Sequence, residues 1–293
     1  MDKRLLYVYN PHSGKGAICN KLGYILDILA KGGYELIVHP TQCVGDARRT
    51  IGEYAAQVDQ IVCSGGDGTL DEVISGVMES GLNIPVGYIP SGSTNDFAET
   101  LGLPKDMLEG ARRIVEGTPF QCDVGALNDK TFVYIAAFGM FTEVSYETSQ
   151  NLKNSIGYMA YLVEAGKRIF DIPSYHVKVT CGDRVVEDNF AYGMISNANS
   201  VGGLKNFPTK NASLDDGLFE ITLVRAPKNP LQLSEAITAM LFGTDSAMLW
   251  KGLADNILLE PDEELHWTVD GEDGGIWKNV EVRNLKRSIT LIR

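Results

Sequence analysis

Short apolar runs alternate with longer amphipathic stretches through the first 125 residues of the chain. The apolar runs predict strands at residues 5–9, 35–39, 60–63 and 86–89. The amphipathic stretches predict helices at residues 18–30, 45–56, 70–79 and 107–116. Strands that alternate with helices are typical of βαβ units, in which helices cover both faces of a parallel sheet. We therefore expect residues 1–125 to form a three-layer α/β domain with a mainly parallel sheet.

From about Asp123 onward the pattern changes to successive strand-like runs. These runs predict strands at residues 132–137, 176–180, 189–196, 218–224, 264–269 and 288–292. Helical stretches are fewer, and the main ones cover residues 156–170 and 231–242. Strands that follow one another with turn residues between them favour an antiparallel sandwich. Residues 126–293 are therefore expected to form a second, β-rich domain.

The charge and cysteine content exclude several classes of protein. With 38 acidic and 26 basic side chains the 293-residue chain has a formal net charge of -12, which argues against nucleic acid as a partner. The five cysteines form no CxxC pair, so a zinc or redox motif is not supported and a reducing cytosol fits. Because apolar residues nowhere form a run of 18, no transmembrane segment is expected. These features predict a cytoplasmic protein.

The first candidate site segment is the loop Asn10 to Gly16, which follows the first strand and precedes a helix. Anions bind at this position in parallel α/β domains, because the amides at the helix start are free. The segment lacks the Walker pattern, and Cys19 occupies the third glycine position of the dinucleotide fingerprint. An oxidoreductase is therefore disfavoured. By itself, the loop is explained equally well as an ordinary strand-to-helix turn.

The second segment, Ser64 to Thr69, surrounds one carboxylate with three glycines directly after a buried strand. Such a density of glycine is needed where backbone approaches a ligand closely. The alternative role for Asp67 is to stabilise the dipole of the next helix. Thr69 and Glu72 have the spacing of a capping box, which predicts that this pair begins that helix.

The third segment, Pro90 to Phe97, follows the next strand and carries hydroxyl, amide and carboxylate side chains. Alone it would be a turn with a helix cap. Thr41 follows another strand of the same sheet. Because the carboxyl ends of parallel strands meet at one edge, we expect all four segments to lie together.

Two acidic turns occur in the second region: Asp215-Asp216-Gly217 and Asp270-Gly271-Glu272. Asp270 and Glu272 alternate along what we expect to be an extended segment, so both side chains would face the same side. A plain hairpin turn is the alternative, since Asp-Gly is a frequent hairpin signal.

In this order and spacing, Asn-Pro-x-Ser-Gly, Gly-Gly-Asp-Gly-Thr and Pro-x-Gly-x-x-Asn-Asp resemble the diacylglycerol kinase catalytic domain, which sphingosine and ceramide kinases share. Features of the second region resemble this family too: Asp123-Val124-Gly125, Phe138-Gly139, Leu214-Asp215-Asp216-Gly217 and Asp270-Gly271-Glu272. The resemblance covers nearly the whole chain. Asp71 stands where the family usually has Asn, and Ser93 where it usually has Thr. The chain also ends soon after the strand at 288–292, where many relatives continue into a helix.

The resemblance implies a role for each site segment. Residues implied to line an ATP site are Asn10, Pro11, His12, Ser13, Gly14, Thr41, Gly65, Gly66, Asp67, Gly68, Thr69, Leu70, Asp71, Ser93, Asn95 and Asp96. A structural Mg²⁺ is implied at Ser213, Asp216 and Leu218, with main-chain carbonyls at the first and third positions. Glu272, with Asp270 beside it, is implied to take the proton of the acceptor hydroxyl. We expect Asp67 to hold a catalytic Mg²⁺ directly or through water, because this ion takes few carboxylates.

The sequence thus predicts an ATP-dependent kinase whose first domain binds nucleotide and whose second domain carries the acceptor site, metal turn and catalytic carboxylates. By resemblance, the acceptor is a lipid alcohol such as diacylglycerol at a membrane surface, the product is phosphatidic acid or a similar ester, and membrane association is transient. A second copy of the chain, in a homodimer, is also among the expected partners. Two alternatives stay open: a kinase for a soluble alcohol or nucleotide, as in NAD kinases, and a non-catalytic lipid- or nucleotide-binding regulator.

Overall fold

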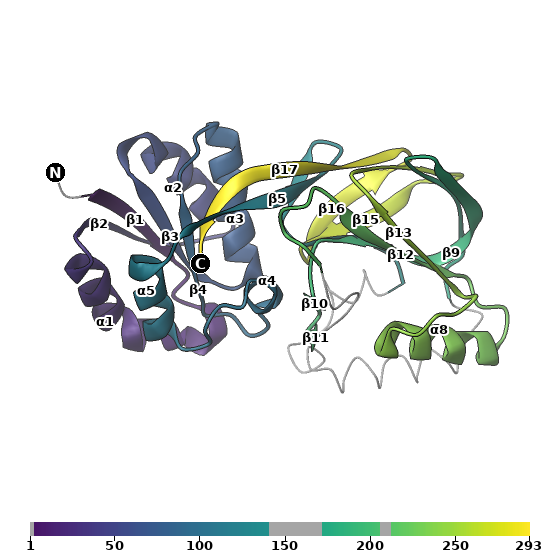
Figure 1. The fold of residues 1–293 in the computed structure, drawn as a ribbon, viewed down its shortest axis with the longest axis horizontal. Helices are drawn as coiled ribbons and strands as arrows, with labels where there is room; N and C mark the ends of the chain where they lie inside the picture. Colours follow the sequence, from purple (N-terminus) through teal and green to yellow (C-terminus); the bar gives the residue numbers. More distant parts are fainter. Residues whose placement is uncertain (1–2, 141–171, 206–211) are drawn as a thin grey trace. The chain divides into compact units, whose positions relative to one another are not determined.

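The computed structural model describes residues 3–140, 172–205 and 212–293 (Figure 1). The elements of the first half are β1 (Lys3–Tyr9), η1 (Ser13–Gly16), α1 (Ala17–Lys31), β2 (Tyr34–Pro40), α2 (Asp46–Tyr54), η2 (Ala55–Gln57), β3 (Gln60–Gly65), α3 (Asp67–Ser80), β4 (Val86–Pro90), α4 (Asp96–Thr100), α5 (Met107–Glu116), β5 (Pro119–Leu127), β6 (Lys130–Phe132) and β7 (Ile135–Gly139). Those of the second half are β8 (Tyr175–Cys181), β9 (Arg184–Ser196), β10 (Ser200–Val201), β11 (Leu204–Lys205), β12 (Phe219–Arg225), α8 (Pro230–Phe242), β13 (Leu249–Ala254), β14 (Asn256–Pro261), β15 (Leu265–Val269), β16 (Glu272–Trp277) and β17 (Val280–Ile292).

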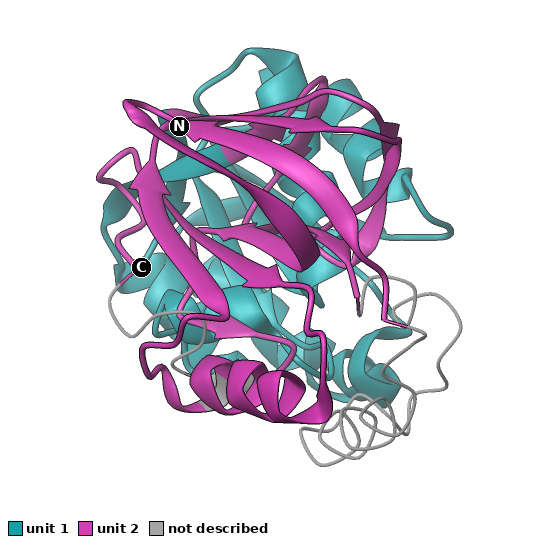
Figure 2. Cartoon of the chain, turned by 90° about the vertical axis from the view of Figure 1, so that its right-hand side faces the viewer, with its two compact units in different colours: residues 1–124, 286–293 teal, residues 125–285 magenta. Residues whose placement is uncertain are grey.

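The chain divides into two compact units, residues 1–124 with 286–293 and residues 125–285 (Figure 2). In the first unit β2, β1, β3 and β4 lie in this order and pair in parallel. Helices α1 and α5 cover one face of this sheet, and α2 and α3 cover the other (Figure 1). Alternate strand residues such as Leu5, Tyr7 and Val62 are fully buried on the α1 and α5 side. The predicted parallel α/β architecture is therefore confirmed.

The second unit is built from antiparallel strands around an aromatic core. The first part of β9 pairs with β8, and its last residues lie between β7 and β12. The long strand therefore links successive parts of the sheet, as strands do at the corners of sandwiches. Phe138 and Trp267 are fully buried with ring centroids 4.9 Å apart. This strand-rich second region agrees with the predicted fold class.

The last eight residues belong to the first unit, although the sequence assigned them to the second. Leu291 and Ile292 pair in parallel with Val86 and Gly87 at the edge of the first sheet. The Thr118 N–H also donates to the carbonyl of Arg293 at 3.0 Å. The end of β17 therefore returns to the first unit and pairs with the edge of β4 that does not face β3.

The sequence pattern located the first-unit helices and strands within a few residues but missed α4 and β5. It also merged β6 with β7 and missed β10, β11, β13, β14 and β16. The helix predicted at 156–170 lies outside the described residues. Within the described part of the chain, no helix is long and apolar enough to cross a membrane.

Candidate functional site

The loops after β1, β3 and β4 are joined by backbone hydrogen bonds. The Asn10 N–H donates to the carbonyl of Ser64 at 2.8 Å, which ties the first loop to the end of β3. The N–H groups of Ser91 and Gly92 donate to the carbonyl of Gly65 at 2.8 and 3.2 Å, which ties the third loop to the second. Thr41 joins them, because its N–H donates to the carbonyl of Tyr9 at 2.9 Å. All four predicted segments therefore lie at one edge of the sheet.

Glycine is required where these loops touch. Gly14 has φ +53°, and a Cβ atom there would stand 2.0 Å from the Ser91 carbonyl oxygen. A Cβ atom on Gly92 would stand 2.5 Å from the Cα atom of Gly66. Both contacts are too close for any side chain, so these two glycines are explained by packing of loop against loop. Gly66 itself is different, since its Cβ would meet the Gly92 Cα at 3.5 Å, an ordinary contact distance.

Asp67 connects the second loop to the third. It is the first residue of α3, and its two carboxylate oxygens accept the N–H groups of Asp96 and Phe97 at 3.1 and 3.3 Å. Those N–H groups are at the start of α4. The N-cap residue of this helix, Asn95, has φ +56°, and its side chain makes no hydrogen bond to the N–H groups of the helix. Asp67 thus supplies charge to the start of a neighbouring helix as well as to its own.

The capping-box prediction for Thr69 and Glu72 is wrong. Helix α3 begins two residues earlier, at Asp67, and its first residues have no side-chain cap from Gly66. The Glu72 carboxylate instead accepts N–H groups of Gly45 and Ala47, at the start of α2. Glu72 therefore does cap a helix, but that helix is α2 and not its own helix α3.

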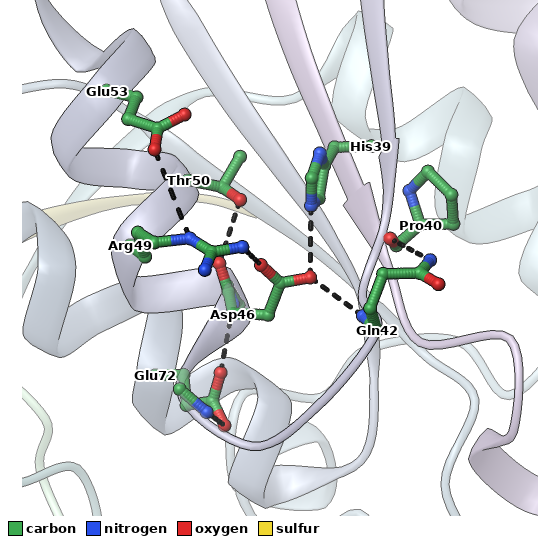
Figure 3. Close-up of polar contacts among 10 residues, drawn as sticks. His39, Pro40, Gln42, Asp46, Arg49, Thr50, Glu53 and Glu72 are labelled. Carbon is green, nitrogen blue, oxygen red and sulfur yellow. Dashed lines mark hydrogen bonds and ion pairs between the residues drawn. The ribbon is translucent and has the colours of Figure 1, made fainter.

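The first residue of α2, Asp46, has a carboxylate that is fully shielded from solvent and faces the turn after β2 (Figure 3). Its Oδ2 accepts the N–H of Gln42 at 2.7 Å and lies 3.2 Å from His39 Nε2, while Oδ1 pairs with Arg49. Burial alone raises the pKa of Asp46, but the Gln42 N–H, His39 and Arg49 outweigh it, so the pKa lies below its usual value. This turn also carries Thr41, which is 9% exposed.

The other residues predicted for the nucleotide site occupy the same loops. Asn10 caps its own loop, because its Oδ1 accepts the N–H of His12 at 2.9 Å. Asn95 binds both the N–H and the carbonyl of Gly92 through its side chain, at 2.9 and 2.8 Å. Ser93 is exposed and Asp96 is buried. Further members are at the following places: Pro11 before η1, Ser13 in η1, and Gly68, Leu70 and Asp71 in α3.

In the second unit, Asp270 and Glu272 are not equivalent, and the expected extended segment is a turn. Asp270 has φ +50° and Gly271 has φ +85° between β15 and β16. Asp270 is 5% exposed, and its carboxylate accepts the N–H groups of Tyr134 and Ile135 at 3.0 and 2.9 Å and that of Val133.

Glu272 is exposed and makes no hydrogen bond or ion pair through its side chain in the described ranges. The two carboxylates therefore do not share one face. The Asp270 carboxylate binds backbone N–H groups, whereas the exposed Glu272 carboxylate can bind another molecule.

Both carboxylates of the predicted metal turn accept hydrogen bonds within the turn. Asp216 Oδ1 accepts the N–H of Leu218 at 2.9 Å, and Ser213 Oγ donates to Asp215 Oδ1 at 3.1 Å. Burial raises the pKa of the nearby Glu220 to about 7, and the charge of Asp216 adds to that rise. Within the described residues, no three or more His, Cys, Asp or Glu side chains lie together in a group suited to a metal. Asp216 supplies a carboxylate of the kind that Mg²⁺ binds, and this ion takes few carboxylates and keeps several waters.

Three features of the site were not found from the sequence. They are the carboxylates of Asp46 and Glu72, and the amide run 133–135 that Asp270 binds. Only Glu72 gave a signal, through its spacing from Thr69, and the sequence pattern attributed that signal to a cap on its own helix. The partners of all three are remote in the sequence or belong to a turn without a motif.

Comparison with known proteins gives a consistent picture. The family profile described as "Diacylglycerol kinase catalytic domain" matches residues 4–127. A diacylglycerol kinase of Bacillus subtilis (strain 168) is 30% identical over 295 residues, which cover 99% of this chain and 96% of that protein. A diacylglycerol kinase of Staphylococcus saprophyticus is 32% identical over 278 residues, covering 94% of this chain and 90% of that protein.

Solved structures agree with these relatives. A crystal structure of a diacylglycerol kinase from Bacillus anthracis has a TM-score of 0.77 and 25% identity, and the match covers 99% of this chain and 97% of that one. Another structure from the same organism has a TM-score of 0.85 and 28% identity, covering 99% and 95%. The similarity thus extends through both compact units.

Proposed function

Because the chain belongs to the diacylglycerol kinase family, a family of lipid kinases that phosphorylate an alcohol acceptor, we propose that it transfers the γ-phosphate of ATP to the hydroxyl of a diacylglycerol-like lipid. The product is then phosphatidic acid or a similar phosphomonoester. The observation that carries this proposal is the set of interlocked loops after β1, β3 and β4 in a chain with full-length diacylglycerol kinase relatives.

ATP is proposed to bind at these loops. Phosphoryl transfer depends mainly on positioning and charge neutralisation, which backbone amides and helix starts supply. Gly66 supports this assignment, because no contact within the described residues requires it to lack a side chain. Asp67 would hold the Mg²⁺ that accompanies ATP, and Ser213, Asp216 and Leu218 would hold a structural Mg²⁺. The bound ion would neutralise phosphate charge.

Glu272 is the proposed base. Its carboxylate takes the proton of the acceptor hydroxyl as that oxygen forms a bond to the γ-phosphorus. The bond from the γ-phosphorus to the bridging oxygen breaks, and ADP leaves with the electron pair. The free, exposed side chain of Glu272 supports this role over Asp270, whose carboxylate already accepts three N–H groups. A diacylglycerol acceptor places the reaction at a membrane surface, which the enzyme would visit from the cytoplasm.

The direct test is incubation of the purified protein with labelled ATP and Mg²⁺ against a panel of acceptors. Diacylglycerol, sphingosine and ceramide in mixed micelles are compared with NAD, glycerol and sugar phosphates. We expect label in a lipid phosphomonoester. Label only in a soluble acceptor would contradict the lipid assignment, and no transfer to any acceptor despite ATP binding would favour a non-catalytic regulator. Asp67→Asn is the control expected to be inactive, because it removes a metal-organising charge. Its thermal stability is measured as well, since the same change disturbs the hydrogen bonds from the Asp96 and Phe97 N–H groups.

A further inference from the structure

Three residues on one face of α3 contact α2, and they are spaced by four and then three positions: Glu72, Gly76 and Glu79. At the far end, Glu79 pairs with the Arg48 guanidinium, whose Nε donates to Oε2 at 2.8 Å. In the middle, a Cβ atom on Gly76 would stand 2.9 Å from Ile51 Cβ, so the helices touch there directly. Residues at i, i+4 and i+7 share a helix face, which explains why these three act on one partner.

Glu72 differs from Glu79 because its partners are backbone groups. Its Oε1 accepts the Gly45 N–H at 2.7 Å and its Oε2 accepts the Ala47 N–H at 3.0 Å (Figure 3). Gly45 is the N-cap of α2, has φ +80° and has no side chain that could cap the helix. The free amides at the start of a helix need acceptors, and a carboxylate there also opposes the positive end of the helix dipole. Glu72 supplies that cap from another helix.

The Gly45 N–H group that Glu72 accepts lies at the end of the turn that carries Thr41. At its beginning, the turn is held by the hydrogen bond from the Thr41 N–H to the carbonyl of Tyr9. At its end, it is held by Glu72, and between them the Gln42 N–H binds Asp46. Asp46 is itself a residue of α2, whereas the Glu72 contact connects this turn to α3.

We propose that Glu72 is a positioning residue for the nucleotide: it fixes the turn at residues 41–45 relative to α3, whose first turn carries Asp67. This inference rests on the proposed function, in which Thr41 and Asp67 line the ATP site. In this proposal Glu72 acts on the nucleotide through Thr41. A glutamine at this position keeps one acceptor oxygen and turns a donor group toward a second N–H, so one hydrogen bond to a charged group is lost.

The experiment compares Glu72→Gln with Glu79→Gln, a matched change seven residues along the same face that breaks only the Arg48 ion pair. Each variant and the wild-type full-length protein is titrated with ATP, assayed for KM and kcat, and melted. We expect Glu72→Gln to weaken ATP binding about tenfold, the size of one hydrogen bond to a charged group, with the KM of the lipid unchanged. Glu79→Gln should bind ATP as wild type does.

Amide hydrogen exchange gives a readout that does not depend on ATP. In Glu72→Gln the N–H groups of Gly45 and Ala47 should exchange faster, while in Glu79→Gln they should keep wild-type rates. Unchanged ATP binding by Glu72→Gln in a wild-type protein that binds ATP would overturn this inference alone. Equal loss in both variants would also overturn it, since the effect would then come from helix packing in general. A wild-type protein that binds no ATP would overturn the proposed function, and this inference with it.

Discussion

The two compact units use their carboxylates differently. In the first unit Asp46 accepts a backbone N–H group of the turn before α2, and Asp67 and Glu72 accept N–H groups at the starts of helices. In the second unit Asp270 accepts three successive N–H groups between β6 and β7, and Glu272, two residues later, is exposed. These three carboxylates of the first unit thus hold loops in place. In the second unit Asp270 has a structural role, whereas the side chain of Glu272 is exposed and can contact another molecule.

This difference separates acidic residues that build a site from those that react in it. Hydrogen bonds from backbone N–H groups favour the charged form of a carboxylate, so a carboxylate that accepts several of them is a weaker base. Glu272 has no such bonds within the described residues. We therefore expect chemistry to depend on Glu272 and stability to depend on Asp270.

The largest effect is predicted for Glu272→Gln. Loss of a general base typically reduces the rate by about 10²–10⁴-fold, and we expect this loss in kcat with nearly normal ATP affinity. Single-turnover transfer and nucleotide titration measure the two quantities. Wild-type transfer by Glu272→Gln, together with an inactive but folded Asp270→Asn, would exchange the roles of the two residues.

Asp270→Asn should instead lower stability. The amide keeps one acceptor and points a donor at the N–H groups of residues 133–135, so we expect a loss of about 3 kcal/mol in the free energy of unfolding. Urea unfolding measures it. Asp273→Asn is the control in the same hairpin, since Asp273 is exposed and contacts His266 and the N–H of Gly275. If Asp273→Asn destabilised the protein as much as Asp270→Asn, burial of Asp270 would not be the reason.

Gly66→Ala tests whether a ligand approaches the second loop. The backbone at Gly66 has φ -87°, and the added methyl group would meet only an ordinary contact with Gly92. The fold should therefore tolerate alanine, while a phosphate against this backbone would clash and lose about tenfold in affinity. Gly92→Ala is the contrast, because its Cβ would stand 2.5 Å from the Gly66 Cα and should destabilise the protein itself. ATP titration with thermal melting distinguishes these outcomes.

The smallest effect is predicted for Asp46→Asn, and it depends on pH. Because the pKa of Asp46 is lowered in the folded protein, its stabilisation is present above the ordinary value of 3.8 and is lost as pH falls through the lowered value. At neutral pH we expect the variant to lose roughly 1 kcal/mol in the free energy of unfolding, the size of a typical net hydrogen bond. The difference from wild type should narrow as pH is lowered from about 5 to about 3. A difference that stays constant with pH would show that the charge of Asp46 is not the source of the stability.

The sequence by itself determined the architecture of the first unit and the residues that gather at its sheet edge. Buried strands such as β1 and β3 are continuous apolar runs, and α1 and α5 carry amphipathic periodicity, so their patterns are local and strong. The three loops were predicted to meet because the carboxyl ends of parallel strands meet at one edge. Strands such as β13 and β16 were missed since exposed and glycine-rich positions interrupt their apolar pattern.

Only the tertiary structure decided what each acidic side chain does. The N–H groups that Glu72 accepts lie 27 and 25 residues away, and those that Asp270 accepts lie 135 to 137 residues away. A carboxylate satisfies any backbone amide that the fold brings to it, so its own sequence neighbourhood does not name the partner. The same reason explains the last residues of β17, whose apolar pattern predicts a strand, while the unpaired edge of β4 decides which unit that strand joins.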